Sequence, residues 1–477
     1  MSLCRLRRFV RLSQAWRDNG YRIVFNDVGK MNRVYLAGAI QLGFALVLIA
    51  LVFTNAFSFF TGLTDLPSYS AAHPDLLDVR QFGIPPYTIR ALGYGVALIQ
   101  VILVPGFASR LFQRPVFRWV CVCLAVFTWG MLLRTIKAPF AISDRDFLMA
   151  FFSRVNGLAF LVSCLIIFDG TPVLRRARSW IAWATLFGIG MNLYEAAYPG
   201  TFSTVVGRAA GLYANANTSG MALAIGCLVS LPAVPRRWRE LMLLAAVAGI
   251  CVTFSREAMI GVLIVIAGGI AAKICSLRRF ILSAALGVTL LVGLSALEID
   301  ADFKTFDGDN LSRLMFESSD QSAQDRLRIA YRVLQSFEDA PLLGQGFGTA
   351  TYWGDEESHN LYLSLMADHG IFGVLLIPAL LMSVWRRSWE SCAFVTLFAL
   401  WCFFDHFVFN TPLAWICIAI EANETAYYRR EAVLRKKCST RSRDMWAVRN
   451  PAPIGIVLLE DVVEESPDDL WRPVRAV

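Results

Sequence analysis

The chain has 477 residues, of which 56% are hydrophobic and 17% are charged, and its mean hydropathy is +0.52. Ordinary soluble domains are far more polar, so this composition excludes a soluble multi-domain protein and indicates that the lipid bilayer is the main solvent. The net charge of +8 could suggest a nucleic-acid binder. The basic residues, however, form short clusters between apolar segments, so we expect a membrane protein with no nucleic-acid partner.

Apolar segments recur along the chain at about the twenty-residue length that a helix needs to cross the hydrocarbon core. They predict an all-α polytopic membrane protein with about twelve transmembrane helices. The predicted spans are 34–60, 88–107, 117–136, 146–168, 179–198, 213–232, 239–254, 257–272, 280–297, 360–384, 391–409 and 411–428. The seventh and eighth are short and meet at 254–257, where they form either an outward-facing hairpin or one broken helix. The charge pattern favours the hairpin.

Lysine and arginine clusters follow every second predicted span, which is the pattern of the positive-inside rule. After a basic N-terminus, the clusters are Arg110/Arg114/Arg118, Arg175/Arg176/Arg178, Arg236/Arg237/Arg239, Lys273/Arg278/Arg279, Arg386/Arg387 and the C-terminal tail. With twelve spans, this alternation places both termini in the cytoplasm.

The spans divide the chain into five parts. A basic cytoplasmic N-terminus (1–33) precedes nine spans (34–297), a large outward loop (298–358), three further spans (359–428) and a charged tail (429–477) that we expect to be cytoplasmic and largely disordered. None of the 11 cysteines falls in the large loop, so no disulfide framework is predicted. The acidic run between Asp300 and Asp309 is expected to be solvated rather than to bind a cation, because its spacing fits no EF-hand.

The large loop contains one helical pattern. Its apolar positions are Leu327, Ala330, Tyr331, Leu334 and Phe337, and the charged Arg328 and Arg332 share a different face. This spacing predicts an amphipathic helix that lies on the membrane domain. Glycines at 344, 346 and 348 then break the chain; with no preceding strand they do not form a nucleotide loop.

Four short motifs follow one another along the chain. They are Arg208-Ala-Ala-Gly211 followed by Asn215-Ala-Asn217, Ser255-Arg256, Arg326 through Pro341-Leu-Leu-Gly344-Gln-Gly346, and His359-Asn360 followed by Gly370 and Gly373. Together, over roughly 205–381, they resemble the O-antigen ligases and the related O-antigen polymerases. The glycines at 370 and 373 are expected to permit close helix packing.

The resemblance implies an enzyme of the bacterial inner membrane that moves a glycan from an undecaprenyl pyrophosphate carrier to an acceptor hydroxyl at the periplasmic face. The acceptor is lipid A core in a ligase and the next lipid-linked repeat in a polymerase, and the sequence leaves both open. Membrane lipids are the remaining partners. No cofactor or metal is expected, because the diphosphate leaving group stores the energy. A secondary transporter is the non-enzyme alternative, but transporters of this size usually show two similar halves.

Arginine suits capture of the diphosphate, because its guanidinium stays charged and donates parallel hydrogen bonds to phosphate oxygens. The outward candidates are Arg208, Arg256, Arg326 and Arg328. We assign Arg256 a catalytic role in stabilising the leaving group and the other three a role in substrate binding. Each could equally bind a lipid headgroup or form a salt bridge.

His359 suits removal of the acceptor proton, since imidazole titrates near neutral pH. We therefore expect it to be the catalytic base, with Asn360 beside it as a substrate-positioning group; the alternative is that His359 only caps a helix. Asp368 and His369 in the tenth span, and Asp405 and His406 in the eleventh, fit a structural ion pair and a substrate contact equally well.

Overall fold

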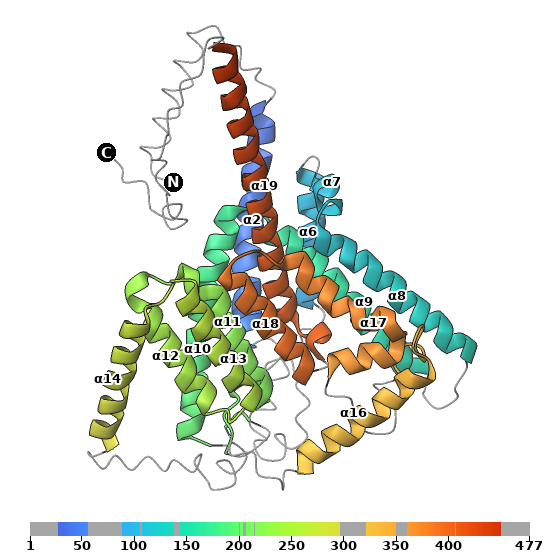
Figure 1. Cartoon of the computed structure of the whole chain (residues 1–477), viewed down its shortest axis with the longest axis vertical. Coiled ribbons are helices and arrows are strands. Elements are labelled where there is room, and N and C mark those ends of the chain that lie inside the picture. Colours follow the sequence, from blue (N-terminus) through green and yellow to red (C-terminus); the bar gives the residue numbers. More distant parts are fainter. Residues whose placement is uncertain are drawn as a thin grey trace. The chain divides into compact units, whose positions relative to one another are not determined.

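The structure is a computed structural model that describes residues 27–55, 88–104, 107–137, 144–199, 201–203, 207–213, 215–295, 321–349, 360–405 and 407–449. His359, His406, the acidic run at 300–309 and most of the predicted loop lie outside the described residues. All regular structure within them is helical (Figure 1), which confirms the predicted all-α class.

Each apolar segment for which a span is predicted contains a helix. These helices are α2 (Asp27–Phe53), α6 (Thr88–Leu103), α8 (Pro115–Lys137), α9 (Asp144–Ile167), α10 (Thr171–Ala197), α11 (Ala216–Ser230), α12 (Arg239–Cys251), α13 (Arg256–Ala271), α14 (Leu277–Ser295), α17 (Leu361–Val384), α18 (Trp389–Phe404) and α19 (Pro412–Arg449). The short α7 (Phe107–Phe112) and the amphipathic α16 (Gln321–Asp339) complete the set of described α-helices.

By length and composition, three of the described helices can cross a membrane: Pro115–Ile136, Ala216–Ala233 and Leu361–Val384. Phe151–Ile167 and Thr171–Ala197, which are bent by 116°, make a fourth if they form one broken span. The count of twelve spans and the periplasmic position of the large loop therefore stay predictions.

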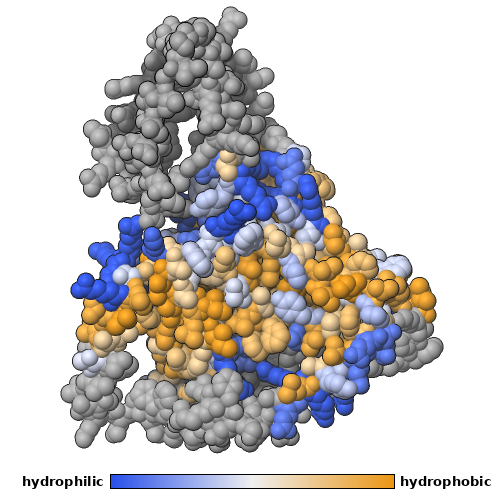
Figure 2. Space-filling model, in the orientation of Figure 1, coloured by the Kyte–Doolittle hydropathy of each residue, from blue (hydrophilic) through white to orange (hydrophobic). Residues whose placement is uncertain are grey.

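The surface of the described helices is strongly apolar. Figure 2 shows hydrophobic side chains in a broad band across the visible face, with hydrophilic side chains along its margins. Large apolar side chains point outward from several helices, for example Trp183 at 70% exposure and Leu263 at 64%. Apolar area of this extent indicates contact with lipid.

α12 and α13 are separate helices that pack against each other across a tight turn at 252–255. Ser255 caps α13, since its hydroxyl oxygen accepts a hydrogen bond of 3.4 Å from the amide of Ala258. The structure thus has two helices that pack on each other rather than a single broken helix, whereas the alternation of the spans stays a prediction.

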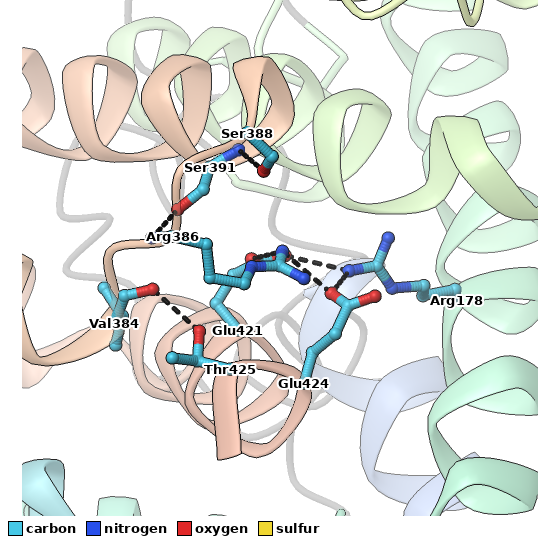
Figure 3. Close-up of polar contacts among 8 residues, drawn as sticks. All are labelled: Arg178, Val384, Arg386, Ser388, Ser391, Glu421, Glu424 and Thr425. Atoms are coloured by element: carbon cyan, nitrogen blue, oxygen red, sulfur yellow. Dashed lines mark hydrogen bonds and ion pairs between the residues drawn. The ribbon is translucent and has the colours of Figure 1, made fainter. Parts of the chain in front are cut away.

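Basic clusters that the charge pattern assigns to one side of the membrane meet in the structure (Figure 3). Arg178 at the start of α10 pairs with Glu421 (2.9 Å) and Glu424 of α19, and Arg386 after α17 pairs with Glu421 (2.6 Å) and Glu424 (3.0 Å). All four side chains are mostly buried. Removal of one partner from such a cluster leaves an uncompensated buried charge, so the cluster holds three distant segments together.

A second polar contact lies beside this cluster. Arg114 at the start of α8 bonds to Asp169 (2.7 Å) and to Asn423 of α19. Thr425 donates a hydrogen bond of 2.8 Å to the carbonyl of Val384 at the end of α17. The helix ends predicted to be cytoplasmic are therefore joined to one another through α19; which side of the membrane they face stays a prediction.

α19 continues to Arg449 and crosses the boundary between two compact units of the chain, 1–426 and 427–477. The first part of the tail, for which disorder is predicted, is thus helical, whereas 450–477 lie outside the described residues. The stretch from 429 to 449 contains neither proline nor glycine, so nothing in it breaks the helix.

α16 is helical as predicted, but its orientation differs from the prediction. Ile329 and Val333 pack against Leu363 and Ala367 of α17. Leu327 is 73% exposed and belongs to the stripe that was expected to face the membrane domain. Close packing against Ala367 favours the branched, compact side chains, and the larger leucine and tyrosine side chains point outward.

α17 is broken at Gly370, whose φ of 61° and ψ of −143° are not helical. The segment that follows α16 fills the break. The amides of Gln345 and Gly346 donate to the carbonyls of Ala367 (2.9 Å) and Asp368 (3.1 Å), and the amide of Ile371 donates to the carbonyl of Pro341 (2.9 Å). The backbone groups that the break frees are thus satisfied by protein, as an apolar surrounding requires.

Glycine is needed on both sides of this contact. A Cβ atom at position 344 would lie 2.4 Å from the carbonyl oxygen of Asp368, and one at position 370 would lie 2.6 Å from the carbonyl carbon of Leu342. The expectation that Gly370 permits close packing is confirmed. Asp368 also accepts a hydrogen bond of 3.0 Å from the amide of Gly348, which adds a side-chain contact to this segment.

We expect Gly370→Ala to undock this segment, because the new side chain meets backbone atoms and the left-handed conformation is strained by about 1–3 kcal/mol. Thermal unfolding of the purified protein should shift down, and glycan transfer should fall with it. The matched control is Gly95→Ala in α6, where a Cβ atom meets nothing within 4 Å. Equal melting temperatures for Gly370→Ala and the wild type would contradict the assigned role.

Candidate functional site

Arg208 lies in the segment between α10 and α11 and is held by the neighbouring helix ends. Its Nε donates to the carbonyl of Thr253 (3.0 Å), and its Nη2 donates to the side-chain oxygen of Asn217 (2.6 Å). The backbone follows the same path, since the amide of Ala209 donates to the carbonyl of Val252 at 3.0 Å. Two motifs that are separate in the sequence, Arg208 to Asn217 and Ser255-Arg256, therefore meet.

Arg256 is the first residue of α13, and it is followed by Glu257, which is only 7% exposed. Within the described part of the chain, the charged groups in electrostatic range of the Glu257 carboxylate are Arg326, Asp405, Arg208 and Arg256. Three of the four candidate arginines thus lie within electrostatic range of one carboxylate. We call Arg208, Arg256, Arg326, Glu257 and Asp405 the charged site.

The two candidate arginines of α16 have different surroundings. Arg326 is half-buried, and its Nε has no hydrogen-bond partner among the residues that the structure describes. Arg328 is exposed and is not among the groups around Glu257. The structure therefore supports Arg326 as part of the charged site and places Arg328 outside it.

Asn360 caps α17, because its side-chain oxygen accepts a hydrogen bond of 3.1 Å from the amide of Leu363. This contact shows that α17 begins where the sequence predicts. His359 precedes the cap directly and lies outside the described residues, so its role as a base stays a prediction.

The remaining ionisable candidates separate into two places. Asp405 ends α18, accepts a hydrogen bond of 3.2 Å from the indole of Trp401 and belongs to the charged site. His369 is buried at the break of α17, with its ring stacked on Phe127 at 5.3 Å between centroids. His369 is therefore part of the packing around the break.

Among the buried carboxylates that sequence reasoning missed, two lie beside the motifs of Arg208 and Arg256. Glu257 follows Arg256 directly, and Glu195 lies near the end of α10 with 1% exposure. Both fall within predicted spans, where a carboxylate is costly unless the protein supplies partners. That cost is the signal in the sequence that could have revealed them.

The charged site can bind a polyanion. Three guanidinium groups outnumber the two carboxylates, and guanidinium recognises phosphate oxygens through charge-assisted hydrogen bonds. Among the described residues, no group of three His, Cys, Asp or Glu side chains is arranged to hold a metal ion. The need for a metal is a separate question that only activity measurements answer.

Comparison with known proteins finds a similar family. Residues 241–378 match the family model described as O-antigen ligase, a stretch that includes Arg256, Arg326 and the break of α17 at Gly370. A search of curated proteins finds no match to the chain. Members of the family are membrane-integral enzymes that transfer lipid-linked glycans. The resemblance seen in the sequence is therefore confirmed over residues 241–378, where the chain is similar to the O-antigen ligase family.

Proposed function

We propose that the protein transfers a glycan from an undecaprenyl pyrophosphate carrier to an acceptor hydroxyl at the periplasmic face of the inner membrane. The observation that carries this proposal is that Arg208, Arg256 and Arg326 all lie within electrostatic range of the buried Glu257. A diphosphate is the anionic group of a lipid-linked donor, and guanidinium groups supply positive charge and parallel hydrogen-bond donors for its oxygens.

In the proposed reaction, His359 takes the proton of the acceptor hydroxyl as the oxygen attacks the anomeric carbon of the donor. The bond between that carbon and the diphosphate oxygen breaks, and its electron pair leaves with the diphosphate. Arg256, assisted by Arg208 and Arg326, stabilises the negative charge that develops on the leaving group. Because cleavage of the bond between the anomeric carbon and the diphosphate supplies the energy, the proposed reaction consumes no nucleotide.

Glu257 and Asp405 have a different task in this proposal. Three arginines that face one another repel, and removal of their hydration is costly without counter-charge. The two carboxylates partly neutralise the site before the donor binds. The carboxylates thus keep the guanidinium groups ordered before the donor arrives. When the donor binds, its diphosphate takes the place of part of their negative charge.

Ligase activity is our first assignment and polymerase activity of the same family is the alternative. A gel that resolves the glycan ladder of a deletion strain separates them. We expect long glycan to disappear from lipid A core while lipid-linked polymer accumulates. Single repeats on the core would instead indicate a polymerase, and an unchanged ladder would contradict transfer to lipid A core.

Substitutions at Arg256 and His359 should differ, because diphosphate capture needs a permanent charge and proton removal needs a group that can be neutral. We expect Arg256→Lys to keep partial activity and Arg256→Ala to be nearly inactive, since lysine retains the charge without the planar fork. His359→Gln should lower the transfer rate by about a hundredfold to ten-thousandfold. The measurement is the initial transfer rate of purified protein in liposomes at matched protein levels.

Arg332→Ala is the control for this series, because Arg332 is exposed on α16 and lies outside the charged site. Its rate should stay near that of the wild type. All rates are measured in EDTA, and activity that returns only with magnesium or calcium would overturn the metal-free reaction. Wild-type turnover by His359→Gln would eliminate the base assignment.

A further inference from the structure

Glu195 holds two separated pieces of backbone with one carboxylate. One oxygen accepts hydrogen bonds from the amides of Phe202 (2.9 Å) and Ser203, and the other accepts from the amides of Ala210 (2.7 Å) and Gly211 (2.7 Å). The side chain belongs to α10 and is 1% exposed. A carboxylate has about four acceptor positions and no donor, so it matches four amides that point at it.

The segment that Glu195 closes is the one that carries Arg208. Its first amide contacts are at 202 and 203 and its last are at 210 and 211, so the carboxylate fixes both ends of the stretch. Arg208 lies in this stretch, two residues before Ala210, and its side chain donates hydrogen bonds to Thr253 and Asn217. A shift of the backbone at 210 therefore moves the guanidinium that contacts the start of α11.

The contact with α10 is close at Gly211. Its φ is 53°, and a Cβ atom there would lie 2.8 Å from the side-chain oxygen of Asn192. Asn192 is itself fixed, because it donates to the carbonyl of Gly249 (3.0 Å) and accepts from the hydroxyl of Ser219 (3.1 Å). The end of the segment thus sits on a rigid surface of α10, with Glu195 as its charged anchor.

We propose that Glu195 is a positioning residue for donor binding, which acts through Arg208 by fixing the backbone on which Arg208 stands. The inference rests on the proposed function, in which Arg208 binds the diphosphate of the lipid-linked donor. Glu195 itself does not touch the donor; its oxygens are occupied by the four amides.

Glu195→Gln is the sharpest substitution, because it keeps the size of the side chain and replaces one oxygen with an NH₂ group. That group faces two amide donors, so one of the two amide pairs loses its acceptor whichever way the new side chain is oriented. Displacement of a binding group by about 1 Å can cost about a hundredfold in rate. We expect kcat/KM for the undecaprenyl pyrophosphate-linked donor to fall by roughly tenfold to a hundredfold, mainly through a higher KM.

A double-substitution cycle separates positioning from general damage. Transfer is measured for the wild type, Glu195→Gln, Arg208→Ala and the double variant, each purified and reconstituted in liposomes. If Glu195 acts through Arg208, the double variant should be no worse than Arg208→Ala. If the loss of kcat/KM in the double variant equals the product of the two single losses, the inference is overturned while the role of Arg208 stands. An unchanged donor KM in Arg208→Ala would overturn the role of Arg208 and this inference with it.

Glu421→Gln is the matched control, since it makes the same chemical change in a buried carboxylate that pairs with Arg178 and Arg386. Its effect on transfer should be the same in the wild type and in Arg208→Ala, because its ion pairs among the described residues are with Arg178 and Arg386, which lie outside the charged site. A loss of this effect in Arg208→Ala would show that the cycle reports general damage, and the inference would fall.

Hydrogen exchange of the wild-type protein provides a test that does not depend on folding of a variant. The amides at 202, 203, 210 and 211 should exchange as slowly as those inside α10, because a buried carboxylate binds them. Exchange at the rate of an open loop would overturn the anchoring by Glu195, whatever the activity of the protein.

Discussion

Backbone amides and carbonyls that lie outside a helix cannot hydrogen-bond to water in an apolar environment. The protein therefore has to supply each of them with a hydrogen-bond partner. Two irregular segments of this chain illustrate how that constraint shapes the site. The segment at 341–348 bonds to the broken backbone of α17, and the segment at 202–211 bonds to the carboxylate of Glu195. Each segment is therefore rigid at its points of attachment.

One of these segments and two helices carry the arginines of the charged site. Arg208 stands on the segment that Glu195 anchors, Arg256 begins α13 behind its Ser255 cap, and Arg326 comes from α16, which packs on the part of α17 before the break. Arginines from three distant parts of the chain thus share the neighbourhood of Glu257. In the proposed reaction this arrangement captures the diphosphate, and Asn360 fixes the helix end beside which His359 stands.

The helices could be predicted from the sequence because contact with lipid requires long apolar segments, and because basic residues gather in the loops on one side of the membrane. Each predicted span contains a helix, and the 254–257 turn is the hairpin that the charge pattern favours. Two features did not follow from such patterns. The packed face of α16 depends on close fit to Ala367, which composition does not reveal. The charge of the tail predicts disorder, yet its first part, 429–449, is helical because it contains no residue that breaks a helix.

The charged site could be predicted in part. Arg208, Arg256 and Arg326 were identified from short motifs and the chemistry of phosphate binding, and the structure brings them together. Arg328 shares the motif region but lies on another face of α16, because two residues of displacement rotate a side chain by more than half a turn around a helix. Glu195 and Glu257 were missed, since periodicity detects apolar faces and gives no information on which backbone amides a buried carboxylate meets.

The central claim is that Arg208, Arg256 and Arg326 together recognise the diphosphate of the carrier. Native mass spectrometry of the purified protein with undecaprenyl pyrophosphate and undecaprenyl phosphate, neither carrying a glycan, tests it most directly. The wild type should bind the pyrophosphate more tightly than the monophosphate. The variant with all three arginines replaced by glutamine should lose that preference while it still binds both lipids. An unchanged preference for the pyrophosphate in the triple variant would contradict the claim.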